Sequence, residues 1–263
     1  MISTIHRFPR HLFPAVLAVV SCLLTLSSCR SSYHLTGISG TRVLIDSRYD
    51  ARPDARAAAF IAPYEQRVDS LMKPVVGQTA RAMAAGRPES TLSNLLADVL
   101  LWSGEGFNER PDFAVYNMGG IRASLPAGDI TNGDVLNVAP FENHICFLTL
   151  TGQKVLQLFG EMAARGGEAV SHGVCVVASR DGKLLNASLN GKPIDPSGSY
   201  RVATLDYLAQ GNDGLEAFKD KTAVVSPQDE KYDVRHIIVS YFRHFARQGK
   251  TVDSKVEGRF TIK

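Results

Sequence analysis

The spacing of apolar residues alternates along this chain between the period of a helix and that of a strand. Between positions 92 and 100, five leucine and valine residues recur at i, i+3, i+4, i+7 and i+8, which predicts a helix with Ser90 as its N-cap. Short apolar runs at 112–116 and 146–150 are typical of buried strands, and a further helical face follows Thr151. A chain that mixes the two periods in this way folds with helices packed on sheets.

The C-terminal part of the chain follows a different pattern, in which short strands are separated by tight turns. Asp181-Gly182 and Asn190-Gly191 favour the positive φ angles of tight hairpin turns. A strand at 200–205, a last helix at 234–245 and a closing strand near Phe260 complete this part. We therefore expect an α+β fold, with mixed β-sheets flanked by helices on the outer faces.

One predicted helix contains a proline. An apolar stripe between positions 60 and 72 has helical spacing, and Pro63 lies within it. A proline inside a helix removes a backbone hydrogen bond and crowds the preceding turn. We expect Pro63 either to start this helix or to kink it.

The first 28 residues have the pattern of a secretory signal peptide. Arg7 and Arg10 precede an apolar stretch from Leu12 to Leu26, which is too short to span a membrane comfortably. The tetrapeptide at 26–29, Leu-Ser-Ser-Cys, resembles the bacterial lipobox, in which the cysteine is lipidated and becomes the mature N-terminus. The alternative is a plain signal peptide followed by a cysteine that has no such role.

The lipobox predicts both the domain organisation and the location of the chain. Residues 1–28 would be a lipoprotein signal peptide, residues 29–42 the lipidated Cys29 with a polar tether, and residues 43–263 the folded domain. Acyl chains on Cys29 would anchor the domain to a membrane. The expected location is the cell envelope, on the periplasmic side or the outer surface of the outer membrane.

The charge balance of the chain offers no surface for nucleic acid. Two of the 29 basic residues lie in the signal peptide, so 27 basic residues face 26 acidic ones in the remainder. No run of like charge occurs. We expect no nucleic-acid partner.

Two cysteines, Cys146 and Cys175, remain beyond the leader and its lipobox. Each lies in an apolar run with the character of a strand. In an oxidising compartment the two could form a disulfide, and buried free thiols are an equally open interpretation. Neither has a second cysteine or a histidine at the spacing of a metal site.

Three loops carry residues that core packing does not explain. Each loop has a binding interpretation and a purely structural one. The loop at 117–122, Asn-Met-Gly-Gly-Ile-Arg, offers backbone N–H groups beside two glycines and an arginine for an anion, or is a tight turn with a surface arginine. Phe141, between Pro140 and polar residues, faces outward or folds onto the core. The loop at 207–214 carries Tyr207 and presents the Asp213 carboxylate, or is a turn with solvated acids.

The order of these motifs resembles the C-terminal domain of the 5′-nucleotidases. The resemblance runs from Arg-Pro-Glu-Ser-Thr-Leu-Ser-Asn-Leu-Leu-Ala-Asp at 87–98 through the loop at 117–122 and Pro-Phe at 140–141 to the loop at 207–214. With the preceding helix it covers roughly residues 45–262. Four motifs in the same order make the resemblance specific.

In that family the C-terminal domain binds the substrate, and the resemblance implies a role for each matching residue. The base would be sandwiched between Phe141 and Tyr207, an arrangement that tolerates different bases because every base has a π-face. The Asp213 carboxylate would accept hydrogen bonds from ribose hydroxyls. The polar side of the nucleotide would be held by Asn117, Gly119, Gly120 and Arg122, with Arg87 as a second cation.

The sequence departs from the family pattern at three of these positions. Tyr207 stands where phenylalanine is usual, and tyrosine stacks equally well. Asn212 replaces a glycine in the family's Gly-Gly-Asp, a change that would shift the turn and with it the Asp213 carboxylate. Arg87 is displaced by one residue from its usual spacing to the Glu-Ser pair.

The catalytic half of the family pattern is missing from the sequence. Nucleotidases of this family hold two metal ions in a separate N-terminal domain, through Asp-x-His, Gly-Asp-x-x-Asn/Asp, Gly-Asn-His-Asp/Glu and Gly-His-x-His motifs. Only the Gly-Asp pattern occurs, at 128–132 and 133–137, and without histidines nearby both are expected to be polar turns. His236 is expected at the surface. We predict neither a catalytic residue nor a metal site in this chain.

The leading hypothesis is the substrate-recognition half of a split 5′-nucleotidase. A separate metallophosphatase chain would supply the divalent metal pair, and the two chains together would dephosphorylate nucleotides for catabolism and salvage. The alternative is a lipoprotein that binds a nucleoside or nucleotide without catalysis. A neighbouring reading frame with Gly-Asn-His-Asp/Glu and Gly-His-x-His would favour the first.

Overall fold

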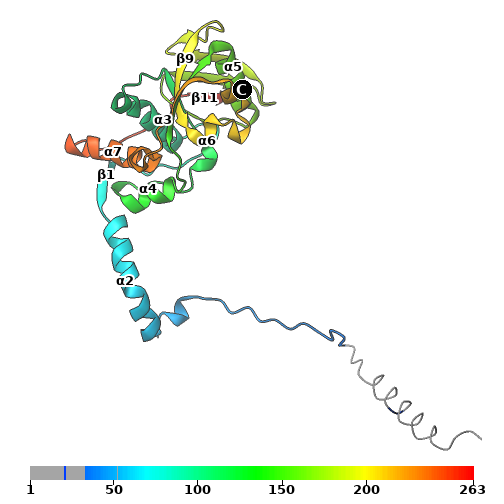
Figure 1. The fold of residues 1–263 in the computed structure, drawn as a ribbon, viewed down its shortest axis with the longest axis vertical. Coiled ribbons are helices and arrows are strands. Elements are labelled where there is room, and N and C mark those ends of the chain that lie inside the picture. Colours follow the sequence, from blue (N-terminus) through cyan, green and yellow to red (C-terminus); the bar gives the residue numbers. More distant parts are fainter. Residues whose placement is uncertain (1–20, 22–32, 52) are drawn as a thin grey trace, which may run out of the picture. The chain divides into compact units, whose positions relative to one another are not determined.

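The structure, a computed structural model, describes residues 21, 33–51 and 53–263 (Figure 1). The predicted signal peptide and Cys29 lie outside the described residues, apart from the single residue 21. The chain divides into two units, Met1–Ala55 and Arg56–Lys263. In the described part of the first unit, side chains are exposed and one short 3-10 helix, η1 (Ser47–Tyr49), is the regular structure. The predicted boundary of the domain at residue 43 stays a prediction.

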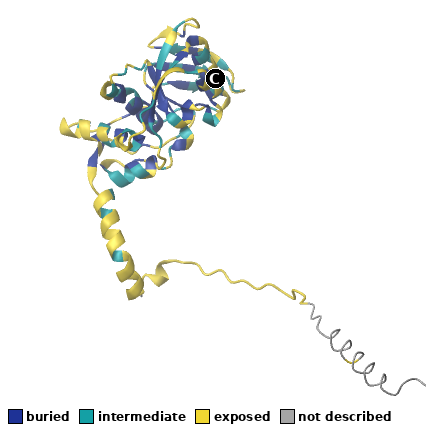
Figure 2. Ribbon diagram, in the orientation of Figure 1, coloured by how far each residue is buried: buried dark blue, intermediate teal, exposed yellow. Residues whose placement is uncertain are grey.

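The second unit is built around a five-stranded mixed sheet. Its strands lie in the order β10 (Thr222–Val225), β4 (Ile145–Thr151), β9 (Ser199–Leu205), β2 (Phe113–Tyr116) and β5 (Ala169–Val170). Strands β2 and β9 run parallel, and the other neighbours are antiparallel. Since β2, most of β4 and the last four residues of β9 are buried, this sheet is the centre of the core (Figure 2).

A second sheet has four strands, and two of its connections are the hairpins predicted from sequence. Its order is β11 (Phe260–Ile262), β6 (Val174–Ala178), β7 (Leu184–Leu189) and β8 (Lys192–Pro193), with β11 parallel to β6. Gly182 has φ +78°, and Asn190 and Gly191 have φ +51° and +76°. These positive angles close the β6–β7 and β7–β8 turns, as expected. A third, two-stranded sheet pairs β1 (Val75–Thr79) with β3 (Gly128–Thr131).

Three longer helices pack against these sheets. Helix α3 (Thr91–Ser103) lies against β2 and β5, α5 (Gly152–Ala164) contacts strands of both larger sheets, and α7 (Val234–Arg247) packs on α3 and β1. Ser90 caps α3 as predicted, since its hydroxyl accepts from the Ser93 amide. Thr151 caps α5 in the same way. The expected fold class, an α+β fold of mixed sheets flanked by helices, is confirmed.

Short helices complete the unit. They are α4 (Asn132–Val138), α6 (Asp206–Ala209), η2 (Gly104–Phe107), η3 (Met118–Gly120), η4 (Asn212–Gly214), η5 (Glu216–Asp220) and η6 (Glu230–Tyr232). In the part of the chain that the structure describes, no helix combines the length and the apolar character needed to cross a membrane.

Helix α2 (Ala55–Met72) differs from the expectation at its start. Pro63 lies inside the helix, which begins earlier in an alanine-rich segment with high helix propensity. None of its residues is buried, and Phe60 and Tyr64 are 70% and 63% exposed. The predicted apolar stripe therefore forms but faces outward (Figure 2).

One other expectation is corrected. The Gly-Asp segments predicted as polar turns at 128–132 and 133–137 form β3 and α4. Their polar side chains make a capping box, in which Thr131 Oγ1 accepts from the Asp134 amide and Asp134 Oδ2 accepts from the Thr131 amide. Of the two alternatives for Cys146 and Cys175, the structure has free thiols, which lie on different sheets; Cys146 is buried and Cys175 is partly buried. His236 is exposed, as expected.

Candidate functional site

The three loops singled out by sequence meet at one edge of the five-stranded sheet. Strands β2 and β9 are parallel neighbours, so the loops that follow them leave the sheet at the same edge. Strand β4 is antiparallel to β9, with Ile145 opposite Leu205, so β4 begins where β9 ends. The loop before β4 therefore joins the loops after β2 and β9.

These loops enclose a cavity of about 220 Å³, which we call the edge cavity. It is lined by Asn117, Gly119, Phe141, Asn143, Tyr207 and Asp213. Phe141 is 48% exposed and Tyr207 is 37% exposed, so neither ring is buried in the core. The structure thus favours the outward orientation of Phe141 over packing onto the core.

The Asp213 carboxylate is the centre of the polar contacts in the edge cavity. Asn117 Nδ2 donates to Asp213 Oδ2 at 2.8 Å, and the Tyr207 hydroxyl donates to Asp213 Oδ1 at 3.1 Å. The bond to Asp213 is the main cause that raises the pKa of Tyr207, which keeps the phenol protonated. An ionised carboxylate has about four acceptor positions, so Asp213 retains capacity for hydroxyl donors of a ligand.

The turn that presents Asp213 accommodates the departure at Asn212. Asp213 has φ +56°, the left-handed conformation that aspartate tolerates better than most residues. The Asn212 Nδ2 atom donates to the Tyr207 carbonyl at 2.8 Å and ties the turn back to α6. Asn212 therefore supports a turn in which Asp213 still reaches the cavity.

Asn117 lines the edge cavity and also lies against Gly120, the second of the paired glycines. Its Oδ1 atom is buried and has no hydrogen-bond partner among the described residues. That atom lies so close to Gly120 that a side chain at this position would collide with it. The glycine at 120 is thus a steric requirement of the Asn117 orientation, while Gly119 lines the cavity itself.

The two predicted arginines do not line the edge cavity. Arg122 is exposed, and its Nη1 atom lies 3.4 Å from the Gly119 carbonyl oxygen. Arg87 donates to Glu168 Oε1 at 2.7 Å. The structure therefore brings five of the eight predicted binding residues to the cavity wall, places Gly120 behind Asn117, and puts both arginines outside it.

Sequence reasoning missed two residues that shape the edge cavity. Asn143 lines it, two positions after Phe141, and its polar character at a strand entry was the available signal. Asp206 precedes Tyr207, and its Oδ1 atom accepts from the Tyr207 amide at 2.7 Å and the His144 amide at 3.1 Å. Asp206 thereby fixes the start of α6 against the start of β4.

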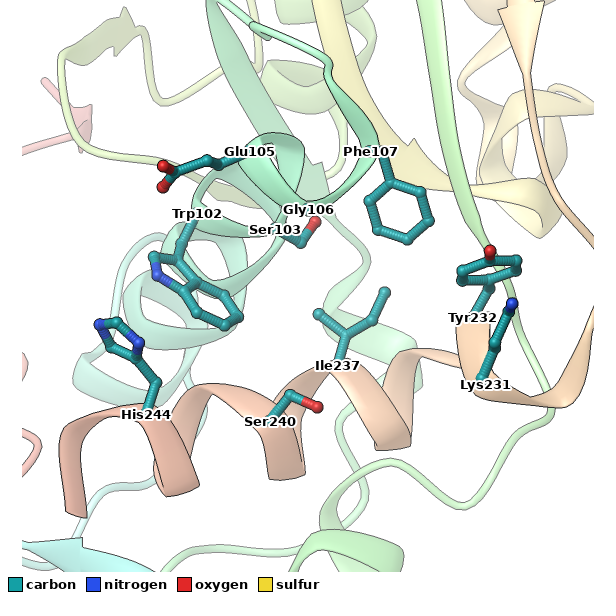
Figure 3. Close-up of a pocket in the computed structure, with 10 residues that line it drawn as sticks. All are labelled: Trp102, Ser103, Glu105, Gly106, Phe107, Lys231, Tyr232, Ile237, Ser240 and His244. Atoms are coloured by element: carbon teal, nitrogen blue, oxygen red, sulfur yellow. The ribbon is translucent and has the colours of Figure 1, made fainter. Parts of the chain in front are cut away.

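A second cavity, of about 380 Å³, lies away from these loops where α3 and η2 face α7 and η6; we call it the helix cavity. Figure 3 shows Trp102 and His244 on one side of it, Phe107 and Tyr232 on the other, and Ile237 of α7 between them. Several of its polar groups have internal partners. The Ser103 hydroxyl donates to the Leu100 carbonyl, a His244 ring nitrogen contacts Gln248 Nε2, and the Lys231 ammonium lies 4.6 Å from the centroid of the Tyr232 ring.

Across the described residues, no group of three or more histidine, cysteine, aspartate or glutamate side chains is arranged to hold a metal ion. The chemistry that the edge cavity offers is recognition. It combines two aromatic faces with a carboxylate and two asparagine side chains.

Comparisons with known proteins show which family the chain resembles. A family model described as "5'-nucleotidase, C-terminal domain" matches residues 75–220. Protein UshA of Escherichia coli is 28% identical over 171 residues, which cover 64% of this chain and 31% of that protein. Protein UshA of Yersinia enterocolitica is 32% identical over 180 residues, 66% of this chain and 32% of that protein. The chain thus spans about a third of the length of these relatives.

The fold is also found among solved structures. The 5′-nucleotidase precursor from Thermus thermophilus superimposes with a TM-score of 0.68 and 26% identity, over 81% of this chain and 44% of that one. The family match extends from β1 through η5 and includes every residue that lines the edge cavity. The chain therefore belongs to the 5′-nucleotidase C-terminal domain family.

Proposed function

We propose that this chain binds a nucleotide or nucleoside in the edge cavity, as the recognition half of a nucleotide phosphohydrolase. The observation that supports the proposal best is that aromatic rings and a hydrogen-bonded carboxylate line the same cavity. The exposed rings of Phe141 and Tyr207 lie in its wall. Asp213 lies there too and accepts from Asn117 and from the Tyr207 hydroxyl. Rings of this kind stack on a base, and a carboxylate beside them accepts from ribose hydroxyls.

In this proposal the hydrolytic step takes place with a separate metallophosphatase chain. Phosphate-ester hydrolysis of this kind needs a pair of divalent metal ions that polarise the phosphoryl group and activate water. The histidine-containing metal motifs of the family do not occur in the sequence. The metals are therefore assigned to the partner, and this chain holds and orients the nucleotide.

Titration calorimetry combined with a phosphate-release assay tests the proposal. The full-length chain is titrated with AMP and with adenosine, and the same sample is then assayed for phosphate release from AMP in the presence of Mn²⁺. We expect saturable binding and no release. Absence of binding to both ligands contradicts the recognition function, and release of phosphate by the chain alone contradicts the split arrangement.

We also propose that the chain is an exported lipoprotein anchored through Cys29. The support is the lipobox at 26–29, behind a basic and apolar leader. Expression in a bacterial host with a radiolabelled fatty acid is expected to label the wild type and not the Cys29→Ser variant. Equal labelling of both, or of neither, contradicts the anchor.

A further inference from the structure

Glu168 carries the least accessible carboxylate near the edge cavity. It follows α5 through a tight turn in which Gly166 and Gly167 have φ +80° and +105°. Its side chain is fully buried, at 0% exposure. Burying a carboxylate costs free energy of folding unless several donors form hydrogen bonds to it.

Three donors satisfy this carboxylate, and they come from three separate segments. Glu168 Oε1 accepts from Arg87 Nη2 at 2.7 Å and from Arg165 Nε at 3.2 Å. Glu168 Oε2 accepts from the Met118 amide at 2.7 Å. Because Met118 lies between Asn117 and Gly119, Glu168 connects the two arginines directly to the turn that forms one wall of the edge cavity.

Arg165 lies beside the turn that presents Asp213 to the edge cavity. Its Nη1 atom lies 3.5 Å from the position that a Cβ atom would take at Gly214, the residue after Asp213. The charge of Arg165 is also felt at Tyr207. The hydrogen bond to Asp213 is the main cause that raises the pKa of Tyr207, and Arg165 acts in the opposite direction. Arg165 is therefore close to both polar partners in the cavity.

The pair of Arg87 and Arg165, which we call the arginine pair, retains a net positive charge and free donors. The two guanidinium groups share one carboxylate, and their side chains are 33% and 38% exposed. Within the described segments, neither guanidinium has a hydrogen-bond acceptor other than Glu168. An arginine that is held by one carboxylate and half-exposed beside a ligand cavity is suited to bind an anionic oxygen.

We propose that Arg165 contacts the ligand and binds a phosphate oxygen on the Asp213–Gly214 side of the edge cavity, while Glu168 is the positioning residue that holds the arginine pair. The inference rests on the proposed function and deepens it, since it makes a nucleotide the preferred ligand over an uncharged nucleoside. It also adds a third arginine to the two predicted from sequence.

Calorimetric affinities for AMP and adenosine test the role of Arg165. In Arg165→Ala, AMP affinity is expected to fall about tenfold, the size expected for a lost hydrogen bond to a charged group, and adenosine affinity to stay within about twofold. Arg180→Ala is the matched control, because it removes one exposed positive charge from the turn after β6. That control is expected to change neither affinity.

Three outcomes separate the possible failures. If the wild type binds neither ligand, the proposed function itself is wrong. If the wild type binds both and Arg165→Ala lowers both affinities equally, or neither, the role of Arg165 is wrong. A competition titration with inorganic phosphate separates two kinds of site. If the site accepts any phosphate, inorganic phosphate displaces AMP but not adenosine. If the site requires the whole nucleotide, inorganic phosphate displaces neither.

The Glu168→Gln variant tests the positioning role. Glutamine preserves the shape of the side chain but holds two guanidinium groups less well than a carboxylate does. We expect the ratio of AMP affinity to adenosine affinity to fall, whereas a purely structural defect would lower both affinities together. A variant that keeps the wild-type ratio contradicts the positioning role, and if this variant does not fold, Arg165→Ala still decides the proposal.

Discussion

Among the described residues, the helix cavity and the edge cavity each have two or more aromatic rings in their walls, and the larger of these two is not where the family motifs meet. The helix cavity, at about 380 Å³, is lined by Trp102, Phe107 and Tyr232, while the edge cavity, at about 220 Å³, has Phe141 and Tyr207. In the edge cavity the polar side chains bond to one another around Asp213. In the helix cavity, Ser103 and His244 instead contact partners outside the cavity wall, the Leu100 carbonyl and Gln248. Convergent polar groups, rather than volume, therefore distinguish a recognition site.

The largest expected difference in AMP affinity between the two cavities comes from replacing one tyrosine in each of them. Tyr207→Ala removes a stacking ring together with the hydroxyl that donates to Asp213, so we expect AMP affinity to fall by about 100-fold, equivalent to about 3 kcal/mol. Tyr232→Ala removes a ring from the helix cavity and is expected to leave that affinity unchanged. Calorimetry on both variants, with circular dichroism to verify folding, checks the pair, and equal losses would contradict the distinction.

A smaller effect is expected when the charge of Asp213 is removed without changing its shape. Asp213→Asn replaces a carboxylate that accepts from Asn117 and Tyr207 by an amide with one acceptor oxygen. We expect adenosine affinity to fall about tenfold, since charge-assisted hydrogen bonds to ribose hydroxyls are lost. Deoxyadenosine analogues provide the control. If their affinities fall as much as that of adenosine, Asp213 does not contact the ribose.

A still smaller effect separates the ring of Tyr207 from its hydroxyl. Tyr207→Phe retains the stacking face and removes only the donor to Asp213. We expect a loss of about threefold in AMP affinity, because a net hydrogen bond contributes roughly 0.5–1.5 kcal/mol. A loss in titration calorimetry as large as that of Tyr207→Ala would show that the hydroxyl, not stacking, dominates.

The smallest expected effect is a fluorescence signal that stays constant. Trp102 is the single tryptophan of the chain, and it lines the helix cavity. A ligand in that cavity would change the surroundings of the indole ring, whereas a ligand in the edge cavity leaves them as they are. We expect intrinsic tryptophan emission to stay constant up to saturating AMP, so a large saturable quench would place the ligand in the helix cavity and contradict the account.

Local sequence signals predicted the helices, the hairpins and the three loops. They did not predict which distant segments pack beside those loops. The spacing of apolar residues and the Ser90 cap define α3, and Asp181-Gly182 defines a hairpin, because these signals act over a few residues. The pairing of β2 with β9 joins segments far apart in sequence, so only the family resemblance suggested that their loops converge.

The features that sequence reasoning misjudged have different physical causes. Glu168 was not predicted as part of the site because two of its three donors, Arg87 and the Met118 amide, come from distant segments, and a single glutamate before an apolar pair carries no local signal. Thr131 and Asp134 were misread because a capping box and a polar turn use the same residue types. The disulfide alternative depended on a distance that strand-like surroundings of Cys146 and Cys175 do not fix.

A crystal structure of the chain with bound AMP tests the central claim most directly. The account predicts the adenine ring between Phe141 and Tyr207, ribose hydroxyls on the Asp213 carboxylate, and no ligand beside Trp102. Adenine bound in the helix cavity, or bound at the sheet edge without contact to either ring, would contradict it.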